Sequence, residues 1–514
     1  MSTPQLDLLL VTPPSRVEVY QELSNTYAAI EPPVWSGLIA HFIRERGYFV
    51  AILDAEAEGL THDQTAQRIA DADPALIVYM IYGQQPSAST QCMPGGRKVA
   101  EKVRTLSDRP SLIIGTHSSA LPERTLRDEA YTYVCRGEGP YTVLGLLEHL
   151  KGKRPLVEVP GLGYWDDGAV KMNDSASKIK DLDSELPTQA WDLLDMSLYR
   201  PHNWQALGNI ANPGGYVSIQ TSLGCPYKCT FCCINAPFGG AGIRYWSPEV
   251  IIKQIDYVVE TYGVKTIKIP DEMFVLNKAH VLGLCDLLIE RDYGLNIWAY
   301  ARIDTVQPEF LEKLRAAGFQ WLGIGIESAS KFVRDGTLKG RFGNEDIKRV
   351  ITDIRAADIN VSGNYIFGLP DDDHNSMCET LNLALELNTE WVNFYSAMAY
   401  PGSPLYDLAR QRGWLLPDEP CGPGWIGYSQ HGYDTLPLPT NKLTGVDVLK
   451  FRDQAFSSFF TNGNYVSMIG RRFGPQAVAH LCEMTKIKIR RRHHDEPEYY
   501  KRLLAECGSQ AIAV

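Results

Sequence analysis

The chain has 514 residues, too many for one ordinary hydrophobic core, so two or three domains are expected. Hydrophobic residues make up 44% and charged residues 22%, the composition of a soluble globular protein. The net charge of −11 argues against a nucleic-acid partner, because phosphate binding needs a basic surface.

Targeting and redox signals are also lacking. No basic signal peptide and no 18-residue apolar run is present, so we expect a cytoplasmic protein without a transmembrane segment. Eleven cysteines are an odd number, and we expect them to be reduced rather than paired in disulfides.

Residues 1–151 alternate between strand and helix patterns. The predicted strands are short and mostly apolar, as buried parallel strands are. Five βα units predict an α/β domain with an open, doubly wound, Rossmann-like sheet that binds its ligand beyond the C-terminal strand ends. The strands are expected at Leu6–Thr12, Phe49–Ala55, Ala75–Tyr82, Ser111–Thr116 and Thr132–Gly137, and the helices at Val34–Arg46, Asp63–Ala72, Gly96–Leu106 and Tyr141–Lys151.

Residues 152–204 contain turn residues and mixed charge, and they predict a linker with a hairpin around Asp166-Asp167-Gly168. A second alternation fills residues 205–413. Six βα units match three-quarters of an eight-unit barrel, whose reactive end is the C-terminal edge of its strands. The strands are expected at Tyr216–Leu223, Thr266–Pro270, Asn296–Ile303, Trp321–Glu327, Asn360–Gly368 and Trp391–Ala399, with helices at Pro248–Tyr262, Ala279–Arg291, Pro308–Ala317, Glu345–Ala357, Met377–Leu387 and Pro404–Arg412.

The alternation stops in residues 414–514. Helical patterns at Val446–Phe460 and Pro475–Glu483 predict a small, mainly helical C-terminal domain that covers the barrel mouth. The basic run Lys486–His494 suits a solvated helix face, or else a contact with an anionic partner.

Three cysteines follow the first barrel strand with the spacing C-x3-C-x2-C: Cys225, Cys229 and Cys232. Such a cluster of thiolates can bind three irons of a [4Fe–4S] cluster and leave the fourth iron open for reaction. Cys229 and Cys232 alone could be half of a zinc site, but no second ligand pair of suitable spacing follows them.

With Phe231 as the aromatic residue of C-x3-C-x-aromatic-C, the chain resembles the radical S-adenosylmethionine (SAM) enzymes that carry an N-terminal cobalamin-binding domain. The resemblance implies three cofactors: a [4Fe–4S] cluster, SAM and cobalamin. It also implies that SAM is cleaved to a 5′-deoxyadenosyl radical, with electrons from a reductase or a flavodoxin-type donor.

The resemblance also suggests SAM-binding residues at the strand ends. Each has a structural alternative: a loop carboxylate, an ion pair between Arg302 and Asp304, or a helix cap. The candidate SAM-binding residues are Phe231, Asp271, Glu272, Arg302, Glu327, Ser328 and Asn364.

Loops at one edge of the first predicted sheet resemble cobalamin-binding loops. The candidate residues are Thr12, Pro13, Pro14, Ser15, Asp54, Glu56, Gly59, Gly115, Thr116, His117, Ser118, Arg136, Gly137 and Glu138. His117 is equally well explained as a hydrogen-bonded loop residue. Glu56 stands where some cobalamin proteins place the histidine of Asp-x-His-x-x-Gly, and a carboxylate suits cobalt poorly, so we expect no histidine ligand from this loop.

The resemblance favours a methyltransferase in which the radical removes hydrogen from an unactivated carbon and methylcobalamin delivers a methyl group to a small-molecule substrate. A cyclase, ring-rearranging or oxygen-inserting enzyme with the same cofactors is the alternative, and a cobalamin-binding sensor is a third reading. Tyr300, Tyr395 and Trp425 are candidate substrate contacts. No catalytic side chain is assigned, and Cys233, Cys378 and Cys421 are given no role.

Overall fold

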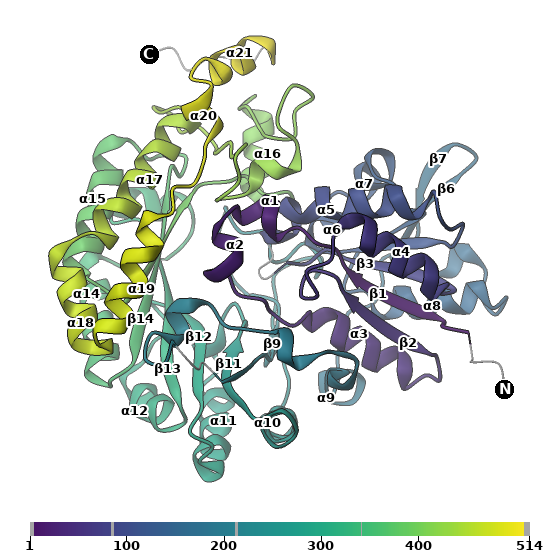
Figure 1. Cartoon of the computed structure of the whole chain (residues 1–514), viewed down its shortest axis with the longest axis horizontal. Helices are drawn as coiled ribbons and strands as arrows, with labels where there is room; N and C mark the ends of the chain where they lie inside the picture. The colour runs from purple at the N-terminus through teal and green to yellow at the C-terminus, as the bar shows by residue number, and fades with distance from the viewer. Residues whose placement is uncertain (1–4, 84–86, 211–213, 341, 508–514) are drawn as a thin grey trace.

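The computed structural model describes residues 5–83, 87–210, 214–340 and 342–507. Two sheets flanked by helices form two halves of the molecule, and the C-terminal helices pack along the second half (Figure 1). None of the helices in the described ranges is long and apolar enough to cross a membrane.

The first sheet has seven strands in the order β2-β1-β3-β4-β5-β6-β7, and the five predicted strands form its parallel part. Both faces are buried at the interior strand β1, because its alternate residues enter different cores: Leu8 and Leu10 one, Leu9 and Val11 the other. The strands are β1 (Leu8–Thr12), β2 (Val50–Asp54), β3 (Leu76–Met80), β4 (Ser111–Ile114), β5 (Tyr133–Cys135), β6 (Leu162–Asp166) and β7 (Ala169–Met172).

The hairpin predicted around residues 166–168 is β6–β7. Its two turn residues, Asp167 and Gly168, have φ angles of 47° and 79°, as a two-residue hairpin turn requires. It does not stand apart in a linker, because β6 pairs antiparallel with β5 and extends the first sheet. After the hairpin, the described part of the connection contains only short helices: α9 (Leu182–Glu185), η2 (Trp191–Leu193), η3 (Met196–Leu198) and η4 (Asn203–Ala206).

Helix α5 departs most from the prediction in the first half, because it begins at Ala88 rather than Gly96. Gly95 lies within it where a Cβ would come 2.4 Å from the backbone oxygen of Pro14, so glycine here permits close packing instead of ending the helix. The helices are α1 (Arg16–Tyr20), α2 (Leu23–Thr26), α3 (Val34–Arg44), α4 (His62–Ala72), α5 (Ala88–Val103), α6 (Thr116–Ala120), α7 (Pro122–Asp128), α8 (Pro140–Leu150) and η1 (Leu156–Glu158), of which α1, α2, α6 and α7 are absent from the sequence prediction.

The second sheet contains the six predicted parallel strands in the order β15-β14-β13-β12-β11-β8 and forms a partial barrel. The first predicted strand is shorter than expected: β8 ends at Ser218, and the next residues form a separate strand, β9, that pairs antiparallel with β10. The strands are β8 (Gly215–Ser218), β9 (Ser222–Leu223), β10 (Arg244–Tyr245), β11 (Val264–Ile269), β12 (Asn296–Arg302), β13 (Phe319–Glu327), β14 (Asn360–Phe367) and β15 (Trp391–Ser396).

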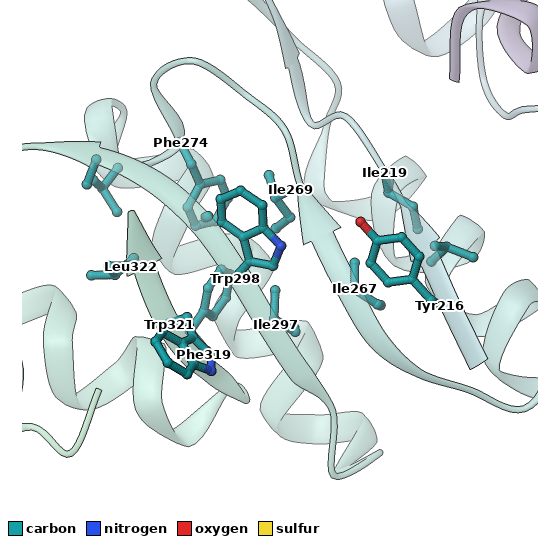
Figure 2. Close-up of a cluster of buried hydrophobic side chains, with 14 of the residues drawn as sticks. Tyr216, Ile219, Ile267, Ile269, Phe274, Ile297, Trp298, Phe319, Trp321 and Leu322 are labelled. Carbon is teal, nitrogen blue, oxygen red and sulfur yellow. The ribbon is translucent and has the colours of Figure 1, made fainter. Parts of the chain in front are cut away.

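Helices cover the outside of the partial barrel, and Figure 2 shows part of the buried cluster formed by aliphatic and aromatic side chains of neighbouring strands. The helices are α10 (Pro248–Tyr262), η5 (Phe274–Leu276), α11 (Lys278–Arg291), α12 (Pro308–Ala316), α13 (Lys331–Gly336), α14 (Asn344–Ala356), α15 (His374–Leu387) and α16 (Pro404–Gln411).

Trp204 lies at the end of the partial barrel where the strands begin, and its ring packs against three tryptophans of those strands. The Trp204 ring lies 5.3 Å from the ring of Trp298, 5.1 Å from that of Trp321 and 6.3 Å from that of Trp391, measured between centroids. Each of these partners lies near the start of its strand. The interior is therefore closed by aromatic packing at that end.

The C-terminal helices pack against β14 and β15 (Figure 1). Arg452 Nε of α17 donates a hydrogen bond to the Phe394 oxygen (2.8 Å), and Tyr465 Oη of α18 donates one to the Glu390 oxygen (3.2 Å). Helix α18 is absent from the sequence prediction. The elements are η6 (Trp425–Tyr428), α17 (Gly445–Phe460), α18 (Gly463–Phe473), α19 (Pro475–Lys486), α20 (Arg492–Asp495) and α21 (Tyr499–Glu506).

The expectation of fully reduced cysteines is wrong at one place. Cys421 and Cys507 form a disulfide, with Cα atoms 6.0 Å apart. The bond joins the loop before η6 to the residue that follows α21. Both cysteines pack against a small buried cluster that contains Leu415 and Leu436. The pairing joins residues 86 positions apart, which spacing in the sequence does not reveal.

Candidate active site

The three predicted cluster cysteines lie on the loop between β9 and β10, next to the C-terminal ends of the barrel strands. Gly224 opens this loop with a φ of +90°, and a Cβ there would come 2.5 Å from the Gly242 oxygen. The Gly242 N–H donates to the Cys225 oxygen (3.0 Å) and the Thr230 N–H to the Thr337 oxygen (3.1 Å). These backbone bonds fix the loop across the barrel mouth.

A cavity of about 640 Å³ lies between the two sheets, and all three cysteines line it. It is bounded by the strand ends of both sheets and by the C-terminal helices, with Trp204 among its lining residues at the closed end. One continuous space thus joins the cysteine loop to the C-terminal strand ends of the first sheet.

The thiols suit a cluster in which each sulfur binds a different iron. Among the described residues, no three His, Cys, Asp or Glu side chains surround the position of one metal ion. Burial raises the pKa of the Cys225 thiol to about 11, and the pKa of Cys232 is raised well above the ordinary thiol value for the same reason. Iron binding would therefore have to deprotonate these thiols, as metals do.

Arg302, from the end of β12, stands beside the cysteine loop. Its guanidinium contacts the Cys229 sulfur (3.4 Å) and lies 3.9 Å from the Tyr227 ring centroid. It also forms two 2.9 Å hydrogen bonds with Asp304, which is the predicted structural alternative. Arg302 lines the cavity, so this fork lies within reach of a bound carboxylate.

The two adjacent carboxylates after β11 have different roles. Asp271 accepts hydrogen bonds from the Thr221 N–H (2.8 Å), Thr221 Oγ1 (2.6 Å) and Ser222 Oγ (2.6 Å), and these bonds bend the chain between β8 and β9. Glu272 has no hydrogen-bond partner among the described residues, although burial raises the pKa of its carboxyl to about 7. It lines the cavity and is the carboxylate that remains open to a ligand.

At the next strand ends, Glu327 forms a buried ion pair with Lys339 (2.5 Å), and Asn364 accepts a 2.9 Å hydrogen bond from Asn393. Both Glu327 and Asn364 line the cavity, as does Phe231. Ser328 does not, because it is fully buried against Thr380 (3.2 Å).

Part of the predicted cobalamin-binding set lines the cavity: Thr12, Pro13, Ser15, Asp54, Glu56 and Thr116. The buried Thr12 hydroxyl has no hydrogen-bond partner in the part of the chain that the structure describes, so it is available to a ligand. Glu56, at the histidine position of the motif, accepts hydrogen bonds from the N–H groups of Ser15 (2.6 Å) and Arg16 (2.8 Å). The Glu56 carboxylate therefore binds the backbone N–H groups at the start of helix α1.

The other residues of this set do not line the cavity: Pro14, Gly59, Gly115, His117, Ser118, Arg136, Gly137 and Glu138. His117 is packed edge-on against Trp425 (4.4 Å between centroids), hydrogen-bonded to Thr90 (3.2 Å), and burial lowers its pKa to about 3. Glu138 is ion-paired with Arg244 of β10 and accepts from the Ile179 N–H (3.0 Å).

Of the predicted substrate contacts, Tyr300 and Tyr395 line the cavity. Trp425 does not. It lines a separate pocket of about 830 Å³ and donates a hydrogen bond to Glu129 (3.2 Å). Of the unassigned cysteines, Cys233 lines the cavity and is buried, with its pKa raised to about 12 by that burial.

Sequence reasoning missed several charged residues that line the cavity, among them Lys268 and Arg452. Lys268 of β11 forms a buried, bidentate ion pair with Glu31 of the first half (2.7 and 2.8 Å). Arg452 of α17 lines the opposite wall with His431. Lys268 could have been found, because it is a charge at an inward position of an apolar strand, whereas nothing in the sequence distinguishes Arg452.

Comparison with known proteins gives separate matches for the two halves of the chain. The radical SAM superfamily model matches residues 219–384, and the B12 binding domain model matches residues 23–147. The uncharacterized methyltransferase PH0819 of Pyrococcus horikoshii is 27% identical over 413 residues, covering 80% of this chain and 84% of that protein. The anaerobic magnesium-protoporphyrin IX monomethyl ester cyclase of Rubrivivax gelatinosus is 24% identical over 387 residues, covering 73% and 66%.

Solved structures share the fold. The radical SAM methyltransferase TsrM from Kitasatospora setae, solved with cobalamin and a [4Fe–4S] cluster, has a TM-score of 0.66 at 16% identity, covering 90% of each chain. The radical SAM enzyme OxsB, solved with aqua-cobalamin and SAM, has a TM-score of 0.69 at 18% identity, covering 96% of this chain and 72% of that one.

Proposed function

We propose that the chain is a cobalamin-dependent radical SAM enzyme and that it acts as a C-methyltransferase on a small molecule. The observation that carries the proposal is the single cavity shared by the cysteine loop and the strand ends of the first sheet. When bound, the cluster and SAM supply a 5′-deoxyadenosyl radical and cobalamin supplies a methyl group, so a substrate carbon held between them meets both.

We assign positioning roles to the residues around that space. Arg302 would bind the SAM carboxylate in place of Asp304, and Glu272 would accept the SAM ammonium group, because no described residue is hydrogen-bonded to its carboxylate. Glu327 and Asn364 would contact the ribose. The aromatic plug at Trp204 keeps water out at the closed end of the barrel.

On the cobalamin side, the unpartnered Thr12 hydroxyl would bind the cofactor, and the Glu56 carboxylate stands where other proteins present a histidine. We propose that this loop provides no nitrogen ligand to cobalt. A reductase or flavodoxin-type protein is the proposed source of electrons.

The test uses protein reconstituted anaerobically with iron, sulfide and cobalamin, given SAM and a strong reductant without substrate. A methyltransferase should form about one S-adenosylhomocysteine per bound cobalamin and should also release 5′-deoxyadenosine. A cyclase or rearranging enzyme should release 5′-deoxyadenosine alone, which would refute the methyl-transfer proposal, and neither product would indicate a sensor. As a matched control, Cys229→Ala should lose 5′-deoxyadenosine but retain S-adenosylhomocysteine.

A further inference from the structure

The wall of the cavity formed by β15 and α17 contains a buried arginine. Arg452 is 4% exposed and lines the cavity. Its Nε donates to the Phe394 oxygen (2.8 Å), one terminal nitrogen to Asp453 (2.8 Å) and the other to His431 Nε2 (3.1 Å). A guanidinium has five N–H donors, so these three bonds leave two free.

Within the described ranges, Arg452 shares its one hydrogen-bonded carboxylate with a second arginine. Its carboxylate neighbour, Asp453, is also bound by Arg491, with Nε 2.9 Å from one oxygen and a terminal nitrogen 2.9 Å from the other. Arg491 is fully buried, and no other side-chain carboxylate in the described ranges is hydrogen-bonded to it or to Arg452. Two cations share one anion, so one positive charge remains on a buried wall, where an unpaired charge is costly.

Two further polar groups of this wall, His431 and Ser396, are neutral. Burial and the adjacent Arg452 lower the pKa of His431 well below its usual range, so the ring adds no charge. Ser396, which also lines the cavity, is 2% exposed, and its hydroxyl has no hydrogen-bond partner. A buried hydroxyl without a partner among the described residues, in the same cavity as a guanidinium that shares its only carboxylate, is the arrangement expected of an anion site that awaits its ligand.

We propose that Arg452, together with the Ser396 hydroxyl, binds an anionic group of the substrate, either a carboxylate or a phosphate. The inference rests on the proposed function, because it assumes that this wall faces the substrate. The same region contains Tyr395 and Phe456, whose rings suit an apolar or ringed body beside the anionic end. The substrate class is therefore an acidic organic molecule.

The first test measures the site directly in the full-length wild-type protein. The rate at which phenylglyoxal modifies Arg452 is followed by peptide mass spectrometry, and the exposed Arg471 serves as the internal control. Inorganic phosphate should slow modification of Arg452 several-fold, whereas chloride at equal ionic strength should not, and neither should change Arg471. Equal rates at Arg452 with phosphate and with chloride would overturn the proposal.

The second test compares variants. In the wild type and in Arg471→Met, phosphate should raise the midpoint of thermal unfolding in a saturable way, because a ligand bound to the folded state stabilises it. The rise should be smaller in Arg452→Met and partly restored in Arg452→Lys, which keeps the charge but not the fork. An undiminished rise in Arg452→Met would refute the assignment.

A third arm separates the substrate from SAM, which also carries a carboxylate. In reconstituted protein, SAM without phosphate should leave Arg452 as reactive to phenylglyoxal as before. Protection by SAM alone would assign the site to SAM and overturn the substrate assignment. None of these measurements depends on turnover. A protein that does not transfer methyl can therefore still show phosphate protection of Arg452, and a protein that transfers methyl can still lack it.

Discussion

The buried ion pair between Glu31 and Lys268 joins the two halves of the protein, and its loss should be costly. The Lys268 side chain is 1% exposed and the Glu31 side chain 8%, and both carboxylate oxygens contact the ammonium. Glu31→Gln leaves the lysine charge buried without an anion, which costs 3–5 kcal/mol in other proteins. Because the pair lines a cavity, we expect the lower end, about 3 kcal/mol.

Urea unfolding followed by tryptophan fluorescence measures this change, because the Lys268 ammonium lies 5.2 Å from the Trp298 ring centroid. Replacing both partners, as Glu31→Gln with Lys268→Met, should recover most of the loss, since no unpaired charge remains. The matched control is the pair Lys278–Glu309, 2.6 Å apart with both side chains more than half exposed, where Glu309→Gln should cost less than about 0.5 kcal/mol. A loss below 1 kcal/mol in Glu31→Gln, or no recovery in the double variant, would refute the reasoning.

Three other predictions concern the cofactors and pH. Replacing Cys225, Cys229 or Cys232 by alanine should abolish the visible absorbance of a reconstituted cluster, whereas Cys233→Ala should retain it. A cluster that survives the loss of one of the three would contradict this ligand set. Arg302→Lys should weaken SAM binding about tenfold or more in equilibrium dialysis, because a lysine cannot form a bidentate pair, and unchanged affinity would remove Arg302 from the SAM site. Burial raises the pKa of Asp54 to about 7, so the stability that its neutral form provides is lost as pH rises from about 4 through 7. The thermal midpoint of the wild type should therefore fall more between pH 5 and 8 than that of Asp54→Asn, and parallel curves would show that Asp54 does not titrate in this range.

The strands were predictable because each is a short apolar run that ends in turn residues, and the cysteine loop was predictable because its spacing is local. The same logic predicted residues at the strand ends of both sheets, and part of them line the cavity. It failed for individual side chains on the loops of the first sheet. His117 turns toward Thr90 and Trp425, and Glu138 turns toward Arg244. These partners come from distant segments, which a single sequence does not bring together.

The groups that sequence reasoning missed have the same origin. Arg452 stands out only in the structure, where it shares the Asp453 carboxylate with Arg491. The split between β8 and β9 depends on Asp271, some fifty residues later in the chain, which bonds Thr221. Local pattern therefore predicts the elements, and long-range pairing decides which side chains face the cavity.

The ion pair between Glu138 and Arg244 has a consequence for how this architecture can change in evolution. Glu138 lies in the loop after β5, the last parallel strand of the first sheet, whereas Arg244 belongs to the β9–β10 ribbon that carries the cysteine loop. An exchange of the first domain with that of a distant relative would leave Arg244 without its carboxylate unless the incoming domain carried an acid at the same place. The two halves are thus expected to be inherited together, and recombination between relatives should succeed most often where this pair travels intact.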